Sequence, residues 1–176
     1  MEKEILISGF GGQGLMSLGK IIARAALKSN KHTIWFPSYG AEMRGGTAHC
    51  FVKISDKPIA SPFIVYPDIA IILNQPSLDK FRKVIKKGIL VTNKDLIGKI
   101  SMSKNITLKN LPLNSMALES GNIKVVNTIA LGLIFPFIKP LVNEESIIST
   151  LRESFKRREI LKINLQAFEK GLSLAG

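Results

Sequence analysis

Short apolar runs alternate with amphipathic stretches along this chain of 176 residues. The apolar or alternating runs that predict strands lie at 5–8, 32–36, 47–55, 68–73, 88–91 and 106–111. The stretches with apolar residues at helical spacing lie at 15–29, 77–87, 112–119, 125–134, 144–155 and 158–170. Strands that alternate with helices are typical of an α/β fold with a largely parallel sheet.

One region departs from the strict alternation. After the strand at 47–55, Asp56-Lys57-Pro58 predicts a turn, and the segment up to Val65 could return as a second strand of a hairpin. A hairpin would make the sheet mixed. We therefore expect a single domain, 1–176, with three α/β/α layers and a mostly parallel, mixed sheet.

A glycine-rich turn joins the first strand to the first helix. Its sequence is Gly9-Phe10-Gly11-Gly12-Gln13-Gly14, in which Gly9, Gly11 and Gly14 fit the dinucleotide-binding pattern G-x-G-x-x-G. Glycines permit a tight turn and let an anion approach the free N–H groups at the helix start. The turn as a whole, with Gly12 and Gln13 included, is a candidate binding site for phosphate groups.

The second part of the dinucleotide pattern is missing. An NAD-binding site needs an acidic residue about 20 positions further on to hold the ribose hydroxyl. The next strand, 32–36, leads into Pro37-Ser38-Tyr39 without a carboxylate. The turn therefore predicts phosphate binding, not a standard NAD site.

A second motif, Pro37-Ser38-Tyr39-Gly40-Ala41-Glu42-Met43-Arg44-Gly45-Gly46-Thr47, follows the second strand. It should lie at the carboxyl edge of the sheet, near the glycine turn, where ligands of α/β sheets collect. Its candidate binding residues are Tyr39, Glu42, Arg44, Gly45 and Gly46. Two simpler explanations are a surface ion pair between the glutamate and the arginine, and a single RGG-type RNA-binding element.

The formal net charge is +12, which permits an acidic partner, an anionic ligand or nucleic acid. The densest basic run, 80–87, has the spacing of the solvent-exposed face of a helix whose buried face holds Leu78, Phe81 and Val84. No zinc-finger, helix-turn-helix or RNP pattern supports nucleic-acid binding.

The sequence also argues against several classes of site and location. Cys50 is the sole cysteine, so the chain can form neither an internal disulfide nor an iron–sulfur cluster of its own. The most apolar stretch, 125–138, is too short for a membrane span, and the N-terminus does not have the pattern of a signal peptide. We therefore expect a cytoplasmic protein that does not bind membranes.

Taken together, the motifs resemble the gamma subunit of 2-oxoacid:ferredoxin or flavodoxin oxidoreductases. The resemblance rests on the glycine turn at 9–14 and on Ser-Tyr-Gly-Ala-Glu-Met-Arg-Gly-Gly-Thr at 38–47. It continues through Val126-Asn127-Thr128 with Leu131-Gly132, and through Asn164-Leu165-Gln166-Ala167-Phe168 with Gly171. The second motif is most similar to that of the 2-oxoglutarate and branched-chain 2-oxoacid enzymes.

The resemblance implies one part of a larger enzyme. In this family a 2-oxoacid bound to thiamin diphosphate loses CO₂, electrons pass through iron–sulfur clusters to ferredoxin, and coenzyme A takes the acyl group. Thiamin diphosphate with its Mg²⁺, and the clusters, would belong to separate alpha, beta and ferredoxin-like delta subunits. This chain is expected to hold no catalytic residue and no metal, and to bind none of these cofactors alone.

Two roles stay open for the glycine turn and the 38–46 loop. They could form a wall of the coenzyme A site, with Arg44 on a phosphate, or they could pack against partner subunits and only shape an interface. Two other functions also stay open at this point. A free-standing nucleotide-binding protein would bind a dinucleotide alone, and a nucleic-acid-binding module would lose affinity steeply with salt.

Overall fold

The computed structural model describes residues 1–38 and 47–176. The strands in these residues are β1 (Glu2–Phe10), β2 (His32–Ser38), β3 (Thr47–Ser55), β4 (Ile69–Ile72), β5 (Gly88–Asn93) and β6 (Ile106–Leu111). The helices are α1 (Leu15–Lys28), α2 (Gln75–Phe81), α3 (Leu113–Glu119), the 3-10 turn η1 (Ile123–Val125), α4 (Val126–Ile138), α5 (Glu144–Ser154) and α6 (Arg158–Ser173). The predicted α/β alternation is confirmed.

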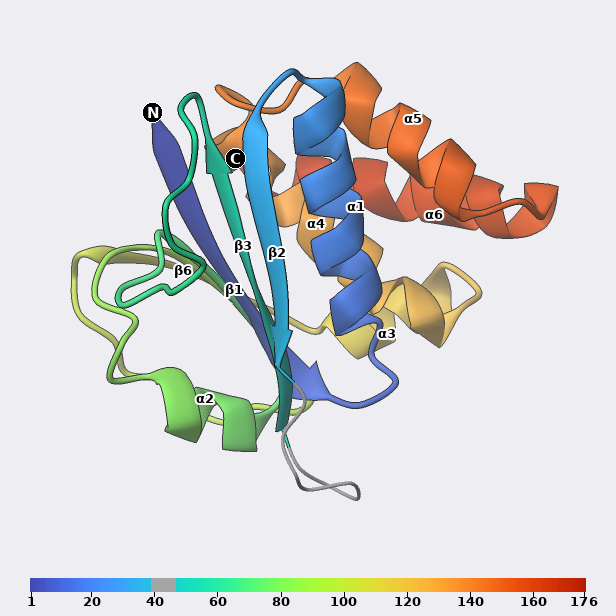
Figure 1. Cartoon of the computed structure of the whole chain (residues 1–176). Helices are drawn as coiled ribbons and strands as arrows, with labels where there is room; N and C mark the ends of the chain where they lie inside the picture. Colours follow the sequence, from blue (N-terminus) through green and yellow to red (C-terminus); the bar gives the residue numbers. More distant parts are fainter. Residues whose placement is uncertain (39–46) are drawn as a thin grey trace.

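The six strands form one mixed sheet in the order β2-β3-β1-β4-β5-β6 (Figure 1). β1, β4, β5 and β6 are parallel, while β3 runs antiparallel to both of its neighbours, β1 and β2. β1 and β2 therefore point the same way, and their carboxyl ends lie at one edge of the sheet. We call this edge the carboxyl edge.

The sheet is mixed, as expected, but for a different reason. The predicted return strand between the Asp56-Lys57-Pro58 turn and Val65 is absent; these residues cross from β3 to β4 as irregular chain. The antiparallel pairing instead joins β3 to the preceding strand, β2. The prediction of a hairpin at 47–65 was wrong because an Asp-Lys-Pro turn after an alternating run satisfies the local signals of a hairpin without supplying a second strand.

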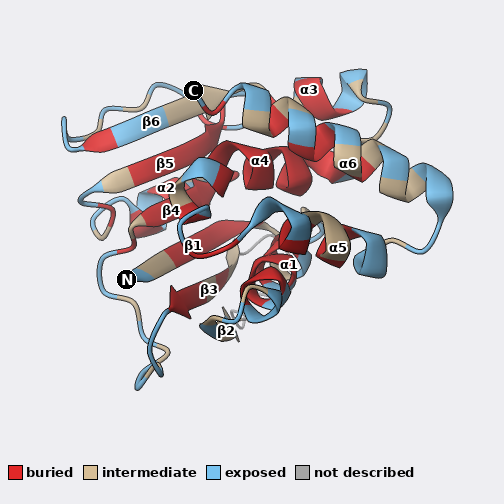
Figure 2. Ribbon diagram, turned by 90° about the horizontal axis from the view of Figure 1, so that it is seen from above, coloured by how far each residue is buried: buried red, intermediate tan, exposed pale blue. Residues whose placement is uncertain are grey.

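Helices cover the two faces of the sheet unequally. The larger core lies between the sheet and α1, α3, α4, α5 and α6, while the smaller one lies between the sheet, α2 and the chain around Ile97. In Figure 2 the central strands are largely buried, whereas β2 and β6 at the two edges carry intermediate and exposed residues. This arrangement is the expected three-layer domain with one thin layer.

The thin layer also corrects a helix boundary. The helix predicted over 77–87 is α2, which ends at Phe81, because the following residues turn toward β5. The predicted buried face is confirmed, since Leu78 and Phe81 are buried and Val84 packs against the same core. The basic side chains of this segment are exposed, as a solvated face requires.

Helices α4 and α6 make the closest helix pair. A Cβ on Gly132 would overlap the backbone of α6, and one on Gly171 would overlap the backbone of α4. Next to this contact, the rings of Phe135 and Phe168 pack edge to face with centroids 5.5 Å apart. The glycines and the phenylalanine that carried the resemblance therefore have a packing role between α4 and α6.

Candidate functional site

The glycine turn leads from the end of β1 into α1 at the carboxyl edge. Gly12 and Gly14 have φ of 89° and 75°, in the left-handed region that favours glycine. Gly14 is the N-cap of α1, and no side chain in the described part of the chain caps this helix. The first hydrogen bond of the helix runs from the Leu18 N–H to the Gly14 carbonyl, over 2.9 Å. The N–H groups of the three residues before Leu18 therefore have no acceptor within the helix.

Gln13 has a structural part in the turn. Its Oε1 accepts a hydrogen bond of 2.6 Å from the backbone N–H of Phe10, across the base of the turn. A Cβ on Gly9 would overlap this oxygen, which explains why glycine stands there. The side chain of Gln13 therefore holds the turn in shape, and the backbone N–H groups at the start of α1 are the donors that the turn offers to an anion.

A buried polar network ties the turn to two distant helices. Asn127, at the start of α4, donates from Nδ2 to the carbonyl oxygen of Gly14 over 3.1 Å. Its neighbour Thr128 donates to Oδ1 of Asn164 on α6, 2.6 Å away, and Asn164 donates to the Ile160 carbonyl over 2.8 Å. The network explains the Asn-Thr and Asn motifs: each buried polar group has a partner.

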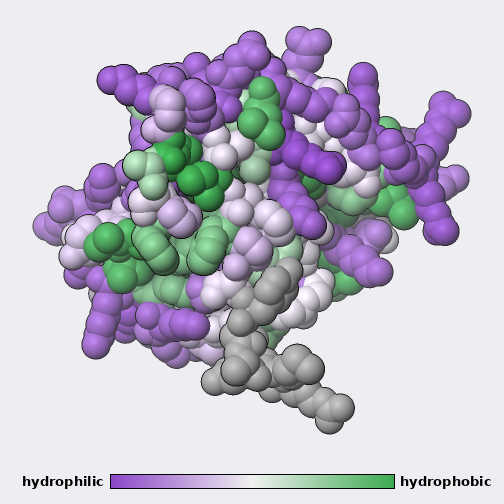
Figure 3. Space-filling model, viewed as in Figure 1, coloured by the Kyte–Doolittle hydropathy of each residue, from purple (hydrophilic) through white to green (hydrophobic). Residues whose placement is uncertain are grey.

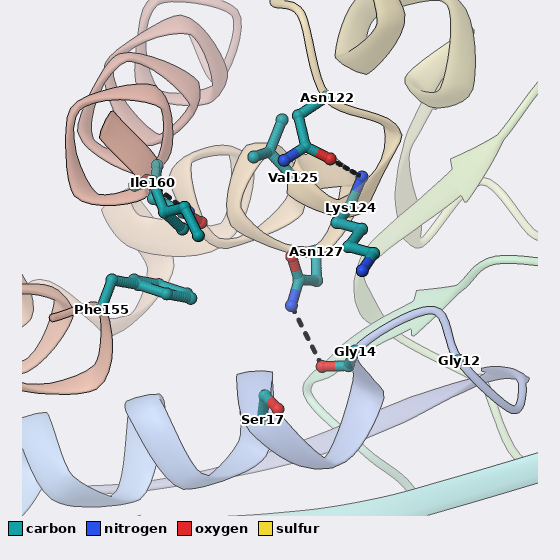
Figure 4. Close-up of a pocket in the computed structure, with 10 residues that line it drawn as sticks. Gly12, Gly14, Ser17, Asn122, Lys124, Val125, Asn127, Phe155 and Ile160 are labelled. Carbon is teal, nitrogen blue, oxygen red and sulfur yellow. Dashed lines mark hydrogen bonds between the residues drawn. The ribbon is translucent and has the colours of Figure 1, made fainter. Parts of the chain in front are cut away.

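A cavity of about 490 Å³ opens between the start of α1 and the helix layer (Figure 4). It is lined by Gly12, Gly14, Ser17, Asn122, Lys124, Val125, Asn127, Phe155, Ile160 and Asn164. Glycines and amides line one part of it, while Phe155 and Ile160 supply an apolar wall. Such a mixture suits a ligand with one anionic and one apolar part.

Lys124 supplies the cation in this lining. It lies on η1, where the side chain of Asn122 caps the turn by accepting from the Lys124 backbone N–H over 3.0 Å. In Figure 4 the Lys124 side chain extends alongside Asn127 on the side of the glycine turn. The first turn of α1 contains no acidic residue, so the helix dipole and the ammonium both favour an anion here.

A second cavity of about 320 Å³ lies against the glycine turn, lined by Phe10, Gly11, Gly12, Gly14, Leu15, Met16, Ser17 and Ala48. It lies beside the start of β3. The residues on either side of the 39–46 segment are fixed here, because Ser38 pairs with His49 and Phe10 pairs with Thr47. The predicted position of the second motif, at the carboxyl edge near the turn, is confirmed for these flanking residues.

The structure thus divides the candidate residues into two groups. It brings together the five residues of the glycine turn, which are Gly9, Gly11, Gly12, Gln13 and Gly14. The other five, Tyr39, Glu42, Arg44, Gly45 and Gly46, lie outside the described residues.

Sequence reasoning missed most of the larger cavity. Asn127 and Asn164 stood in motifs that carried the resemblance, but they were not counted as site residues. The available signal was in α4, where Asn127 and Thr128 are polar residues in an otherwise apolar helix, whereas Asn164 lies in a helix with many polar residues. The sequence does not predict that Lys124 and Phe155 line the cavity, because a lysine in a turn and a phenylalanine after a helix are common on any protein surface.

Burial affects two titratable side chains of β3, Cys50 and His49. Burial raises the pKa of the Cys50 thiol to about 12, so the thiol stays neutral. Burial also lowers the pKa of His49, with a smaller contribution from nearby Lys80. Residues 1–38 and 47–176 contain no group of three or more His, Cys, Asp or Glu side chains placed to hold a metal ion. Among the same residues, each helix is too short or too polar to cross a membrane.

A sequence model of the family described as pyruvate ferredoxin/flavodoxin oxidoreductase matches residues 4–174. The chain belongs to this family. The match includes the glycine turn, the Asn127 network and the close pair of α4 and α6, so it covers every feature of the candidate site.

Named relatives fall into two kinds. The chain is 36% identical, over 99% of its length, to ketoisovalerate oxidoreductase subunit VorA of Methanothermobacter marburgensis, but it spans only 37% of that longer protein. It is also 36% identical to 2-oxoglutarate synthase subunit KorC of Methanocaldococcus jannaschii and spans 95% of that protein. The same unit therefore occurs as a separate subunit and as about a third of a longer polypeptide.

Solved structures agree with the fold. The keto/oxoacid ferredoxin oxidoreductase gamma subunit from Geobacter sulfurreducens matches with a TM-score of 0.87 and 29% identity, over 99% of this chain and 97% of that one. The 2-oxoglutarate:ferredoxin oxidoreductase from Magnetococcus marinus, solved with 2-oxoglutarate, coenzyme A and succinyl-CoA bound, matches with a TM-score of 0.88 and 25% identity. The match covers 99% of this chain and 31% of the Magnetococcus chain.

Proposed function

We propose that the chain is the gamma subunit of a multisubunit 2-oxoacid:ferredoxin oxidoreductase. The assembled enzyme oxidatively decarboxylates a 2-oxoacid, passes the electrons to ferredoxin or flavodoxin, and forms an acyl-CoA. The observation that carries this proposal is the family match over residues 4–174. Alpha, beta and ferredoxin-like delta subunits supply the thiamin diphosphate, Mg²⁺ and iron–sulfur chemistry, and the complex is cytoplasmic.

Within that complex, the glycine turn forms part of the wall of the coenzyme A site. The N–H groups at the start of α1 and the ammonium of Lys124 bind phosphate oxygens, as helix N-termini and lysines do in other phosphate sites. Phe155 and Ile160 provide apolar contact for the rest of the ligand. Coenzyme A in the Magnetococcus structure supports this assignment by similarity.

The 38–46 loop contributes Tyr39, Glu42 and Arg44 to the same edge of the sheet. Arg44 is the residue we assign to a phosphate, because a guanidinium binds two phosphate oxygens at once. Gly45 and Gly46 allow the chain to turn closely beside a ligand. The competing role, in which the loop and the glycine turn only pack against a partner subunit, predicts normal coenzyme A kinetics wherever assembly is normal.

The substrate we propose is 2-oxoglutarate. The relative KorC supports it, because nearly its whole length matches this chain. A branched-chain 2-oxoacid or pyruvate is the alternative, since VorA is equally identical and a pyruvate synthase subunit is also among the relatives. The residues that select between these acids are expected to lie in the other subunits.

The test is reconstitution. The chain is co-expressed with alpha, beta and delta subunits, and the purified complex is assayed for coenzyme A-dependent reduction of ferredoxin with 2-oxoglutarate, 2-oxoisovalerate and pyruvate. We expect activity that is strictly dependent on this chain and highest with 2-oxoglutarate. A complex that is fully active without this chain contradicts the proposal. Tight binding of NAD by the isolated chain would instead favour a free-standing nucleotide-binding protein.

A further inference from the structure

Apolar side chains are exposed on the face of the sheet that α2 covers only in part. Phe36 on β2 is 39% exposed, and three residues of the crossing between β3 and β4 are more so: Phe63 at 70%, Val65 at 65% and Tyr66 at 51%. Phe36 and Phe63 pack edge to face, with ring centroids 6.2 Å apart. We call these four residues the aromatic patch. Figure 3 shows apolar residues gathered on this face, with hydrophilic side chains around them.

The patch continues across the sheet as a row of rings. Phe36 is directly opposite Phe51 in the β2–β3 register, so their side chains lie on the same face. The rings of Phe51 and His49 are 5.5 Å apart, and those of His49 and Phe81 are 5.0 Å apart. The row thus runs from the crossing segment to α2. At the β2 end of the row, no helix of the described residues covers the sheet.

Two further features favour a protein partner at this place. β2 is an edge strand, so one side of its backbone is unpaired within the described sheet, and exposed apolar edge strands readily pair with other chains. The α2 end of the row is basic: the ammonium of Lys80 lies 5.3 Å from the Phe81 ring centroid, in a chain with a net charge of +12. The surface therefore suits a partner with an apolar centre and acidic groups beside it.

The relatives indicate which partner this is. In VorA the matching unit is about a third of one polypeptide, so the remaining two thirds are joined to it permanently. In KorC nearly the whole protein matches, so the corresponding remainder must be supplied by a different subunit. In addition, β2 ends at Ser38 at the same edge of the sheet as β1, so the patch lies on a strand that leads to the carboxyl edge.

We propose that the aromatic patch and the β2 edge are the docking surface for the subunit homologous to the remainder of VorA. This inference rests on the proposed function. Docking there holds the partner beside the carboxyl edge, where β1 leads into the glycine turn.

The test measures the affinity of the chain for that purified subunit by fluorescence titration. The double variant Phe63→Ser/Val65→Ser removes the two most exposed members of the patch from an irregular segment, and circular dichroism and thermal melting confirm that it folds. The matched control is Leu27→Ser/Leu118→Ser, which changes two leucines of similar exposure, 59% and 63%, on α1 and α3. We expect the patch variant to raise Kd at least about tenfold, the scale of interface anchor residues, and the control to change it less than about twofold.

The outcomes separate this inference from the proposed function. If the unaltered chain binds the subunit and the patch variant binds equally well, or if both variants weaken binding equally, the docking surface is wrong while the gamma-subunit function stands. If the isolated chain is a dimer that the patch variant converts to monomer without affecting subunit binding, a second copy occupies the patch. If the unaltered chain binds no partner subunit, the proposed function itself fails.

Discussion

The side chain of Asn127 donates to the carbonyl oxygen of Gly14 over 3.1 Å, although 113 residues separate the two. The same carbonyl accepts the first hydrogen bond of α1 from Leu18. One oxygen therefore fixes both the start of α1 and the start of α4. Because the cavity lies between these two helix ends, its shape depends on this contact.

The glycine turn yields a matched pair of substitutions. Gly14→Ala should destabilise the fold by about 1–3 kcal/mol, since the residue has positive φ and its Cβ would overlap the amide of Asn127. Gly11→Ala should change stability by less than about 0.5 kcal/mol, because its Cβ would meet nothing within 4 Å. Urea unfolding of both variants checks the prediction, and equal losses would show that the turn is not held as described.

Asn127→Ala should lower the free energy of unfolding by about 1–3 kcal/mol, because it removes the hydrogen bond of a buried side chain to the Gly14 carbonyl and opens space beside the turn. In the assembled enzyme the KM for coenzyme A should rise, while the KM for the 2-oxoacid stays the same. Asn105→Ala, on an exposed turn, is the control for both measurements. A rise in both KM values together would point to general loosening instead.

Lys124 should act through its charge. Lys124→Met keeps most of the side-chain length but removes the ammonium, and it should raise the KM for coenzyme A about tenfold, the scale of a charge-assisted hydrogen bond. Lys124→Arg should restore most of the affinity, and Lys139→Met, after the end of α4, should have no effect. Since Lys124 is exposed, stability should not change. Unchanged coenzyme A kinetics in Lys124→Met would remove the lysine from the site.

Arg44 tests the two roles of the second motif. If its guanidinium binds a coenzyme A phosphate, Arg44→Ala should weaken coenzyme A use by about 1.5–3 kcal/mol while assembly and decarboxylation survive. If it pairs with a carboxylate of a partner subunit, the same change should loosen the complex and reduce every partial reaction together. Subunit retention and coenzyme A dependence, measured on one preparation, distinguish these outcomes.

Much of the fold was readable from local patterns. Apart from the segment before Val65, each run predicted to be a strand is one, and the glycine turn is identifiable because residues 9–14 carry their own conformational signal. Pairing partners were harder to predict, because an alternating strand such as β3 fits equally well in a hairpin with the chain before it or after it. The hairpin was assigned to the wrong side for this reason.

The site itself was only half predictable. Its α1 side lies in one continuous segment, whereas its other walls come from η1, α4, the residue after α5, and α6. No periodicity of the sequence predicts the contact between Asn127 and Gly14, since it depends on how α4 and the start of α1, far apart in the sequence, are placed in the fold. Only the resemblance had drawn attention to these residues.

Cys50 gives a prediction about pH. Burial raises the pKa of its thiol from 9.0 to about 12, so folding favours the neutral thiol. Its contribution to stability is complete below about pH 9 and is lost as the pH rises toward 12, by up to about 1.4 kcal/mol per pH unit. Urea titrations at about pH 8.5 and about pH 10.5 compare stability near the unfolded pKa of the thiol and above it. Between these two pH values, Cys50→Ala should lose less stability than the unaltered chain. A thiol reagent that labels the native chain rapidly at about pH 8 would contradict this account.

The direction of β1 determines where a domain or tag added ahead of Met1 meets the fold. The strand begins at Glu2 and ends at Phe10, next to the glycine turn, so its nine residues separate the chain start from the turn by about 30 Å. A large domain fused ahead of Met1 would therefore be attached at the end of β1 farthest from the glycine turn. It would leave the carboxyl edge of the sheet undisturbed.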